Sequence, residues 1–533
     1  MLTLAHVRRL QGGRATRSRA HVADTPGPDG STPLIVACKR GIIADVKLWL
    51  DYGANPALEG KQFAKPYAED DYQVLPLTEA AKYGHGEVVA LLLSLDGVDV
   101  NDATSDIGFT ALYCACGKGR ILVVELLLAH DSIDVNKARA DYGATPLYAA
   151  CYNGRTEAVN ALLACDAIDV NKARTHNGST PLNTACRKGH TATVHALLTC
   201  DEIDVNKART DSGSTPLWIA CYYGHIEAVE ALLACNTIDV NSARTDDGTT
   251  PLFTACSQGC TAVVKALLAS GNVDVNTATT EGGYTPLYIA CYHGHTGIVN
   301  ELLACDAIDA NKARADGGTT PLYAACRNGH TKAVNALLAC DEIDVNKTRT
   351  IGGDTPLHVA AWKGYLLVVQ QLVVCGANRH TRTLHNSTAL QLAIKSAKHD
   401  VAAWLQATAG WSPLKVAAAC RLHTIAAMQL RNGSIDPDDP TTTTPAEVLA
   451  IVAVAQVPVD ALPWENALPV CNATIKLMEA AAAGWSRTAH WLHHRGVRQT
   501  VHTLLLVSER LHRASVANSN SDEAEGAAAL SVG

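Results

Sequence analysis

Aromatic residues are scarce in this sequence. Phe, Trp and Tyr together make up 5% of its 533 residues, and only three of them are Phe. Hydrophobic residues nevertheless reach 47%, so a core must be built mostly from Ala, Leu, Val and Cys, a composition that suits many thin, close-packed helices. Long apolar runs are also missing, since the longest, residues 448–455, falls short of the ~18 residues that a membrane span needs. We therefore expect a soluble protein with no membrane span.

Positive charge is not in excess either. The net charge is −8, which argues against a large basic surface for nucleic-acid binding. The charge is uneven, because residues 1–23 hold five Arg and no acid. This segment is Arg-rich and acid-poor like an organelle transit peptide, but it has few Ser and no hydrophobic signal core. We interpret residues 1–24 as a basic N-terminal extension, with a targeting signal as the alternative.

Catalytic motifs are absent from the sequence. It contains no phosphate-binding Gly-rich loop, no GxSxG motif and no paired Cys/His nucleophile arrangement. We therefore expect neither an enzyme nor a cofactor-binding protein.

What the sequence has instead is an internal repeat. The tripeptide Thr-Pro-Leu recurs at intervals of 35 residues, with its Thr at Thr145, Thr180, Thr215, Thr250, Thr285, Thr320 and Thr355. The same step extends back to Thr110 and Leu75, and further copies begin at Thr32, Thr388 and Ser412. A period of this length is typical of a stacked repeat protein, and the copies predict twelve units.

Each unit predicts two short helices. In the unit GSTPLWIACYYGHIEAVEALLACNTIDVN, Thr215 is an N-cap and Pro216 suits the first turn, where no backbone N–H is needed. Gly224 ends this helix, and apolar residues at helical spacing from Ile226 to Leu233 predict a second one. The polar stretch that follows predicts a turn or hairpin. A helix pair this short cannot bury both faces alone, so neighbouring units must stack into one continuous core.

This pattern closely resembles the ankyrin repeat, whose unit reads G-x-TPLHxAAxxGHxxxVxxLLxxGADVN. The resemblance covers residues 25–433 and implies an all-α repeat solenoid of helix-turn-helix units with hairpin loops, here followed by a short C-terminal helical region. The period is 35 residues rather than the ~33 of that family, and the second Ala of the motif is Cys in most units. The His survives only at His358, its counterparts being Tyr113, Tyr148, Asn183, Trp218, Phe253, Tyr288 and Tyr323.

The cysteines follow the repeat. One set lies in the first helices at Cys116, Cys151, Cys186, Cys221, Cys256, Cys291 and Cys326, and another ends the second helices at Cys165, Cys200, Cys235, Cys305, Cys340 and Cys375. Free Cys behaves as a small buried hydrophobe, so we expect core packing in a reducing compartment, the cytoplasm or the nucleus. Metal binding or redox sensing is the alternative, but Cys114-x-Cys116 and Cys256-x-x-x-Cys260 lack the paired spacing of a zinc site, and no metal is expected.

Stacking turns each variable position into a row of side chains. The residues that follow the Ala-Cys pair alternate between Tyr and Arg from repeat to repeat, with Ser257 as the exception, and Tyr, Trp and Arg dominate interface hot spots. The resemblance implies that this row lies on the concave surface of the array. We predict partner binding by Tyr152, Arg187, Lys188, Tyr222, Tyr223, Tyr292, His293, Arg327 and Trp362. The alternative is that duplication of a two-repeat unit copied the alternation without any partner.

A second row of side chains is basic. It comprises Lys137, Arg139, Lys172, Arg174, Lys207, Arg209, Arg244, Lys312, Arg314, Lys347 and Arg349. Such a row could bind an acidic partner or phosphates. Because an Asp precedes each Asn-Lys pair, as Asp204 does, we interpret the row as a solvated edge of ion pairs.

Several segments depart from the regular repeat. Residues 57–74 lengthen the first hairpin, either for a specific contact or as a tolerated insertion. Residues 434–470 are rich in Pro and Thr and predict a linker around one short helix, residues 471–513 predict two helices, and residues 514–533 predict a disordered tail. We expect residues 471–513 to cap the open end of the array, with docking of a partner as the alternative. His490, His493 and His494 have no carboxylate or Cys at ligand spacing, so they do not predict a metal site.

These observations predict a non-enzymatic protein–protein interaction scaffold that binds one or more protein partners on its concave surface. The alternative is a substrate adaptor of a ubiquitin-ligase complex, in which the repeats choose the substrate and residues 471–513 dock ubiquitin-ligase subunits. Arrays of this kind bind unrelated partners on one fold, so the resemblance does not identify the partner.

Overall fold

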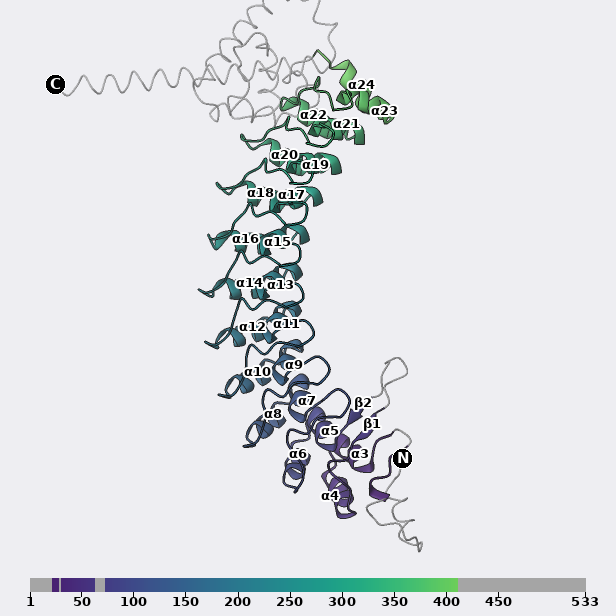
Figure 1. The fold of residues 1–533 in the computed structure, drawn as a ribbon, viewed down its shortest axis with the longest axis vertical. Coiled ribbons are helices and arrows are strands. Elements are labelled where there is room, and N and C mark those ends of the chain that lie inside the picture. Colours follow the sequence, from purple (N-terminus) through teal and green to yellow (C-terminus); the bar gives the residue numbers. More distant parts are fainter. Residues whose placement is uncertain (1–21, 28–29, 63–71, 411–533) are drawn as a thin grey trace, which may run out of the picture. The chain divides into compact units, whose positions relative to one another are not determined.

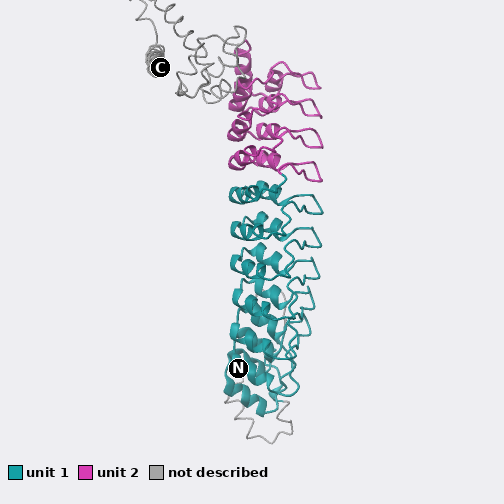
Figure 2. Cartoon of the chain, turned by 90° about the vertical axis from the view of Figure 1, so that its left-hand side faces the viewer, with its two compact units in different colours: residues 1–274 teal, residues 275–533 magenta. Residues whose placement is uncertain are grey.

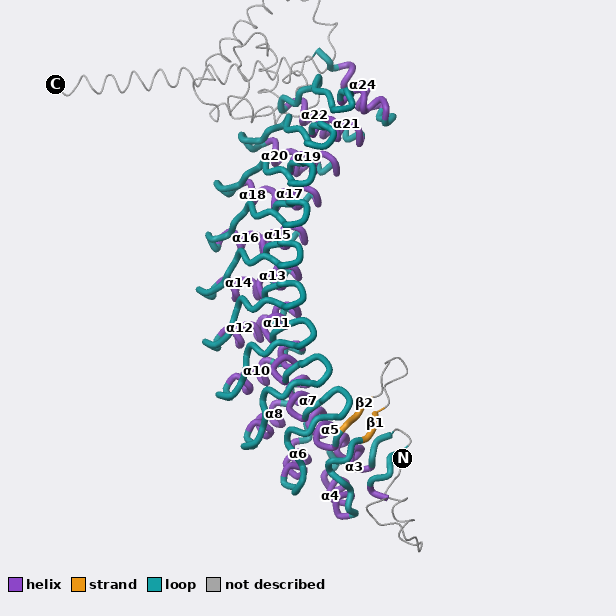
Figure 3. The backbone as a smooth tube through the Cα atoms, in the orientation of Figure 1, coloured by secondary structure: helices purple, strands orange, loops and turns teal. Residues whose placement is uncertain are grey.

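The computed structural model describes residues 22–27, 30–62 and 72–410 (Figure 1). The chain divides into two compact units, residues 1–274 and residues 275–533 (Figure 2). Each unit is a stack of repeats, and each repeat is a pair of short helices followed by a long loop (Figure 3). The stacked helix pairs confirm the predicted all-α repeat solenoid.

In the first unit, the helices form two layers. The first helices of successive repeats are α3 (Pro33–Arg40), α5 (Pro76–Tyr83), α7 (Ala111–Lys118), α9 (Pro146–Tyr152), α11 (Pro181–Lys188), α13 (Pro216–Tyr223) and α15 (Pro251–Gln258). The second helices are α4 (Ile43–Asp51), α6 (Gly86–Leu93), α8 (Ile121–Leu128), α10 (Thr156–Leu163), α12 (Thr191–Leu198), α14 (Ile226–Leu233) and α16 (Thr261–Ala269). First helices pack against first helices of adjacent repeats, and second helices against second helices (Figure 1).

The second unit repeats this arrangement. Its first helices are α17 (Pro286–His293), α19 (Pro321–Asn328), α21 (Pro356–Lys363) and α23 (Ala389–Lys395), and its second helices are α18 (Thr296–Leu303), α20 (Thr331–Leu338), α22 (Leu366–Val374) and α24 (His399–Ala407). The weak copy at Thr388 therefore forms a complete helix pair. The twelfth copy, at Ser412, lies outside the described residues.

Local signals start and end the first helices as predicted. Thr215 Oγ1 accepts a hydrogen bond from the backbone N–H of Trp218 at 3.2 Å, and Pro216 occupies the first helical position. Gly224 ends α13 with φ at 71°, and its N–H donates to the carbonyls of Ala220 and Cys221. A Cβ at Gly224 would lie 2.8 Å from the Sγ of Cys260 in the next repeat, so close stacking also requires glycine here.

The core lies between the two helix layers. Leu217, Cys221, Val229 and Leu232 are completely buried, and each large aliphatic side chain buried in this way contributes ~1.5–3 kcal/mol. All seven cysteines of the first-helix set are buried, which confirms the packing predicted for them, whereas those that follow the second helices are only half-buried. Every cysteine of the described residues is a free thiol.

Asparagine side chains connect the loops that follow the second helices. Asn206 Nδ2 donates to the carbonyl of Thr237 at 2.7 Å, and its Oδ1 accepts from the N–H of Asp239 at 2.8 Å, both in the next repeat. The same pair of bonds recurs at Asn101, Asn136, Asn171, Asn241, Asn276, Asn311 and Asn346. The sequence indicated only a turn at this position.

The insertion of residues 57–74 forms the predicted hairpin at its base. Strands β1 (Gly60–Gln62) and β2 (Tyr72–Val74) are antiparallel, with Lys61 opposite Gln73. The connecting residues, 63–71, lie outside the described part of the chain, as do residues 1–21 and the predicted linker, C-terminal helices and tail. In the described part, no helix is both long and apolar enough to cross a membrane.

Candidate partner-binding surface

The two residues before the Gly that follows each first helix from α3 to α21 form a row in each unit, and at least one residue of every pair is exposed. We call these residues the turn row. Because adjacent first helices pack side by side, their ends line up from repeat to repeat (Figure 3). All nine residues predicted to bind a partner belong to the turn row, and all nine are exposed.

In the first unit, α13 contributes two neighbouring tyrosines. Tyr222 and Tyr223 are 41% and 47% exposed. The Tyr222 ring stacks on the buried Trp218 at 5.3 Å between centroids and meets the Tyr223 ring edge-on at 5.0 Å. These contacts support the rings within the protein while leaving a face of the pair uncovered, so little side-chain freedom remains to be lost on binding.

Adjacent repeats interact along the turn row. Lys188 Nζ lies 4.3 Å from the centre of the Tyr152 ring, a cation–π contact between α11 and α9. The backbone of the row is held by the following repeat, since Nε2 of His190 lies 3.2 Å from the Tyr152 carbonyl and Nε2 of His225 lies 3.3 Å from the Arg187 carbonyl. The predicted residues of this unit therefore lie on a supported backbone.

The second unit carries its own part of the turn row. Tyr292 is 41% and Trp362 is 47% exposed, and Arg327 lies on the repeat between them. The Tyr292 ring stacks parallel to Tyr288 at 6.5 Å and meets His293 edge-on at 5.2 Å. Burial, followed by the nearby His295 and His330, lowers the pKa of His293, so this side chain is neutral at pH 7.

The turn row extends over repeats for which the sequence analysis named no site. Tyr83 is 37% exposed, and the ammonium groups of Lys39 and Lys82 lie 5.7 and 5.6 Å from its ring centre. Arg40 and Lys118 are exposed at the ends of α3 and α7. Their position immediately before a helix-ending Gly is the signal that could have identified them.

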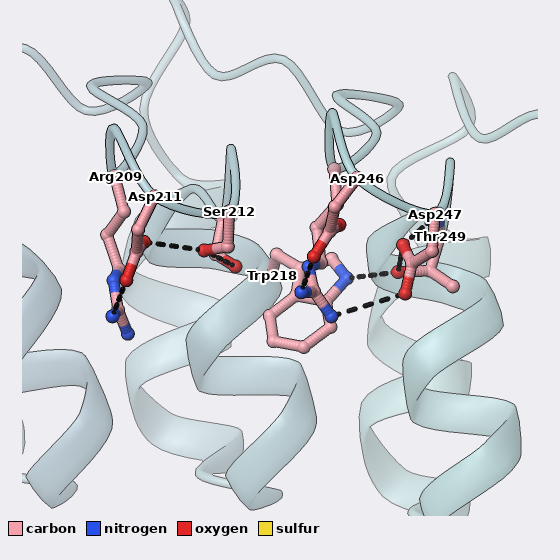
Figure 4. Close-up of polar contacts among 9 residues, drawn as sticks. Arg209, Asp211, Ser212, Trp218, Asp246, Asp247 and Thr249 are labelled. Atoms are coloured by element: carbon pink, nitrogen blue, oxygen red, sulfur yellow. Dashed lines mark hydrogen bonds and ion pairs between the residues drawn. The ribbon is translucent and has the colours of Figure 1, made fainter. Parts of the chain in front are cut away.

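Most arginines of the predicted basic row make ion pairs, but with other acids than the Asp residues that precede the Asn-Lys pairs. Within the described residues, no lysine of the row makes an ion pair. Asp204 Oδ1 accepts from the backbone N–H of Asn206, whereas Arg209 pairs at 2.5 Å with Asp211, which follows it in the hairpin (Figure 4). Arg244 likewise pairs with Asp246. The hairpin turn brings the residue two positions downstream beside the guanidinium, which the linear spacing did not indicate.

Most arginines of the basic row also cover an aromatic ring of the preceding repeat. The Arg244 guanidinium lies 4.7 Å from the Trp218 ring centre, and Arg174 lies 5.2 Å from that of Tyr148, whose hydroxyl accepts from Arg174 Nη1 at 3.3 Å. At His358, by contrast, Nε2 lies 3.0 Å from the Thr381 carbonyl. At Tyr113, Tyr148, Trp218, Tyr288 and Tyr323, the Arg–aromatic contact thus joins consecutive repeats, whereas His358 does so through a hydrogen bond to the backbone.

The described residues contain no group of three or more His, Cys, Asp and Glu side chains placed to hold a metal ion. His490, His493 and His494 lie beyond residue 410 and outside the described part of the chain, as does the segment 471–513 proposed as a cap or docking region.

Comparison with known proteins gives the relatives of this chain. A family model described as ankyrin repeats (3 copies) matches residues 5–104, 80–174, 168–244, 238–316 and 306–383. Among solved structures, 520 chains match. One is the crystal structure of the human ASB11 ankyrin repeat domain, which is 30% identical and covers 42% of this chain and 97% of its own, with a TM-score of 0.36. No curated protein matches.

Proposed function

Because the chain belongs to the ankyrin-repeat family, we propose that it is a non-enzymatic scaffold that binds a protein partner on the turn row. Ankyrin repeats generally mediate protein–protein interaction. The observation that supports this surface is its exposed aromatic side chains. Tyr222, Tyr292 and Trp362 are 41–47% exposed, although the residues before them in each first helix are almost all buried.

Binding energy at such a surface depends on a few anchors. Tyr, Trp and Arg carry most hot spots because each buries a large area and keeps a polar group. The turn row offers these residue types on successive repeats, and the ring stacks beneath Tyr222 and Tyr292 limit their motion. A largely preformed surface of this kind loses little entropy when a partner binds.

The experiment is affinity purification from the native cell with the full chain and a double variant, Tyr222→Ala with Tyr292→Ala. We expect recovery of partners to fall at least ~tenfold, which corresponds to ~1.4 kcal/mol. The free energy of unfolding should change little, because both rings lie at the surface.

The matched control is Tyr142→Ala. Tyr142 is 47% exposed but lies in a hairpin, outside the turn row. Its removal should leave partner recovery unchanged. Equal losses for the control and the double variant, or a double variant that no longer folds, would contradict the proposal.

The alternative function, a substrate adaptor that docks ubiquitin-ligase subunits through residues 471–513, stays a prediction. That segment lies outside the described residues, and nothing in the described residues favours it. Truncation of the chain after Gly433 separates the scaffold function from the adaptor function.

A further inference from the structure

The turns between first and second helices carry an unusual charge. In the first unit, each turn consists of two turn-row residues, the Gly and one further residue, spanning 39–42, 82–85, 117–120, 152–155, 187–190, 222–225 and 257–260. These segments contain no Asp or Glu. Their basic residues are Lys39, Arg40, Lys82, Lys118, Arg120, Arg155, Arg187 and Lys188. The whole chain has a net charge of −8, so this surface is opposite in sign to the protein that carries it.

Stabilisation of the helices through their dipoles explains only some of these basic residues. Cations in the last turn of a helix interact favourably with its dipole, as Lys39 and Lys118 do. Arg120 and Arg155, however, stand at the N-caps of α8 and α10, where the helix dipole disfavours a cation.

The hydrogen bond made at the N-cap position does not require a permanent charge. Arg120 Nε donates to the Lys82 carbonyl at 3.2 Å. His85 makes the equivalent contact with the Lys39 carbonyl at 3.1 Å, and His225 makes it with the Arg187 carbonyl. Arginine therefore adds charge that the fold does not need.

The protein itself neutralises little of this charge. Within the described residues, the ion pair that involves this set joins Lys82 to Glu79 at 3.0 Å, and Glu79 is buried. Arg40, Lys118, Arg187 and Lys188 are exposed. The surface thus presents cations to solvent.

We propose that the turn row of the first unit binds an acidic, extended segment of a partner protein. The inference rests on the proposed function and specifies its partner. Packed helices lie ~8–10 Å apart and an extended chain advances ~3.3–3.6 Å per residue, so a carboxylate at about every third residue would meet one repeat after another. Tyr83 and Tyr152, each beside a lysine ammonium, offer ring surface to the residues between the acids.

The test uses the full chain and fluorescently labelled peptides about 15 residues long, enough to cross ~five repeats. One peptide carries Glu at every third position with Ser and Leu between, and its matched control carries Gln instead of Glu. We expect the Glu peptide to bind at least ~tenfold more tightly at about 50 mM salt, and this advantage to shrink at about 300 mM salt. Equal binding of the two peptides would overturn the proposal.

The variant test is the double substitution Arg187→Gln with Lys188→Gln. It should weaken Glu-peptide binding about tenfold. Its control is Lys47→Gln with Lys332→Gln, two exposed lysines on the second helices α4 and α20, which should bind the peptide normally. Thermal melts should confirm that both variants fold. Equal weakening in both, or single-stranded DNA of the same length binding more tightly than the Glu peptide, would overturn the acidic-peptide proposal.

The scaffold proposal and the acidic-segment proposal can be contradicted independently of one another. If Tyr222→Ala with Tyr292→Ala loses the cellular partners while Arg187→Gln with Lys188→Gln keeps them, the acidic segment is wrong and the scaffold function stands. If neither double variant loses partners, the turn row is not the binding surface and both proposals are wrong.

Discussion

At the residue scale, cysteine takes the place of the small Ala of the repeat motif and adds a titrating group to the core. Burial raises the pKa of the Cys38 thiol from 9.0 to about 12, and it also raises the pKa values of the Cys151, Cys186 and Cys221 thiols well above 9.0. At a pH between the unfolded and the folded pKa, the buried thiol stays neutral, whereas the same thiol in the unfolded chain ionises. Because its pKa is higher in the folded than in the unfolded state, each buried thiol contributes its full stabilisation below pH 9. This stabilisation is lost as the pH rises from 9 towards the folded pKa.

We therefore predict alkaline unfolding that depends on the number of buried cysteines. The triple variant Cys151→Ala, Cys186→Ala and Cys221→Ala should show a shallower loss of unfolding free energy above pH 9, by ~1.4 kcal/mol per pH unit for each cysteine removed. Urea unfolding between pH 7 and about pH 10.5 measures this slope. The values at pH 7 separate any packing effect from titration, and an unchanged alkaline slope would contradict the prediction.

At the scale of the element, the hairpins join repeats through arginines that lie on the aromatic residues of the preceding first helix. The contact differs between neighbouring hairpins. Arg244 covers Trp218, whereas the counterpart of Trp218 one repeat earlier is Asn183, which faces the hairpin of Arg209. Both arginines pair with an Asp two residues downstream, Arg209 with Asp211 (Figure 4) and Arg244 with Asp246. Arg244 also pairs with Asp247 at 3.3 Å.

Arg244→Ala should destabilise the protein by ~1 kcal/mol more than Arg209→Ala. Arg209→Ala loses one ion pair. Arg244→Ala loses two, with Asp246 and with Asp247, and also a partly buried cation–π contact, which is worth ~0.5–2 kcal/mol. Chemical denaturation of both variants gives the difference. If the two substitutions destabilised the protein equally, the ion pairs would be the main contribution of these arginines to stability.

At the scale of the molecule, the role of the proposed partner-binding surface and the role of the C-terminal region can be tested separately. Repeat arrays are stabilised by contacts between neighbours, and they need a polar cap at each end. The turn row lies entirely within the described repeats, so the array should recruit partners without the residues that follow it.

We expect a chain truncated after Gly433 to recover the same partners as the full chain in affinity purification with mass spectrometry. The truncated protein should still melt cooperatively, with a lower melting temperature if residues 471–513 cap the array. Recovery of ubiquitin-ligase subunits with the full chain alone, together with a cooperative melt of the truncated protein, would instead favour the adaptor function.

The helices, their ends and the buried positions of the first helices could be predicted from the sequence alone. Thr215 and Gly224 begin and end α13 as predicted, and the cysteines of the first helices are buried as predicted. These features depend on interactions within a few residues along the chain, such as a cap, a left-handed glycine or an apolar period, and the 35-residue repeat displays each of them many times.

The contacts between repeats, and the side chains that lie together at the surface, could not be predicted without the three-dimensional structure. Asn206 bonds to residues 31 and 33 positions away, Arg174 bonds to a tyrosine 26 positions away, and Arg209 pairs with Asp211 because a hairpin turns between them. Within the first unit, the basic residues of the turn row are brought together for the same reason, because adjacent first helices pack side by side. Such contacts depend on the distance and register between stacked repeats, which the packing of the core sets and which no single repeat contains.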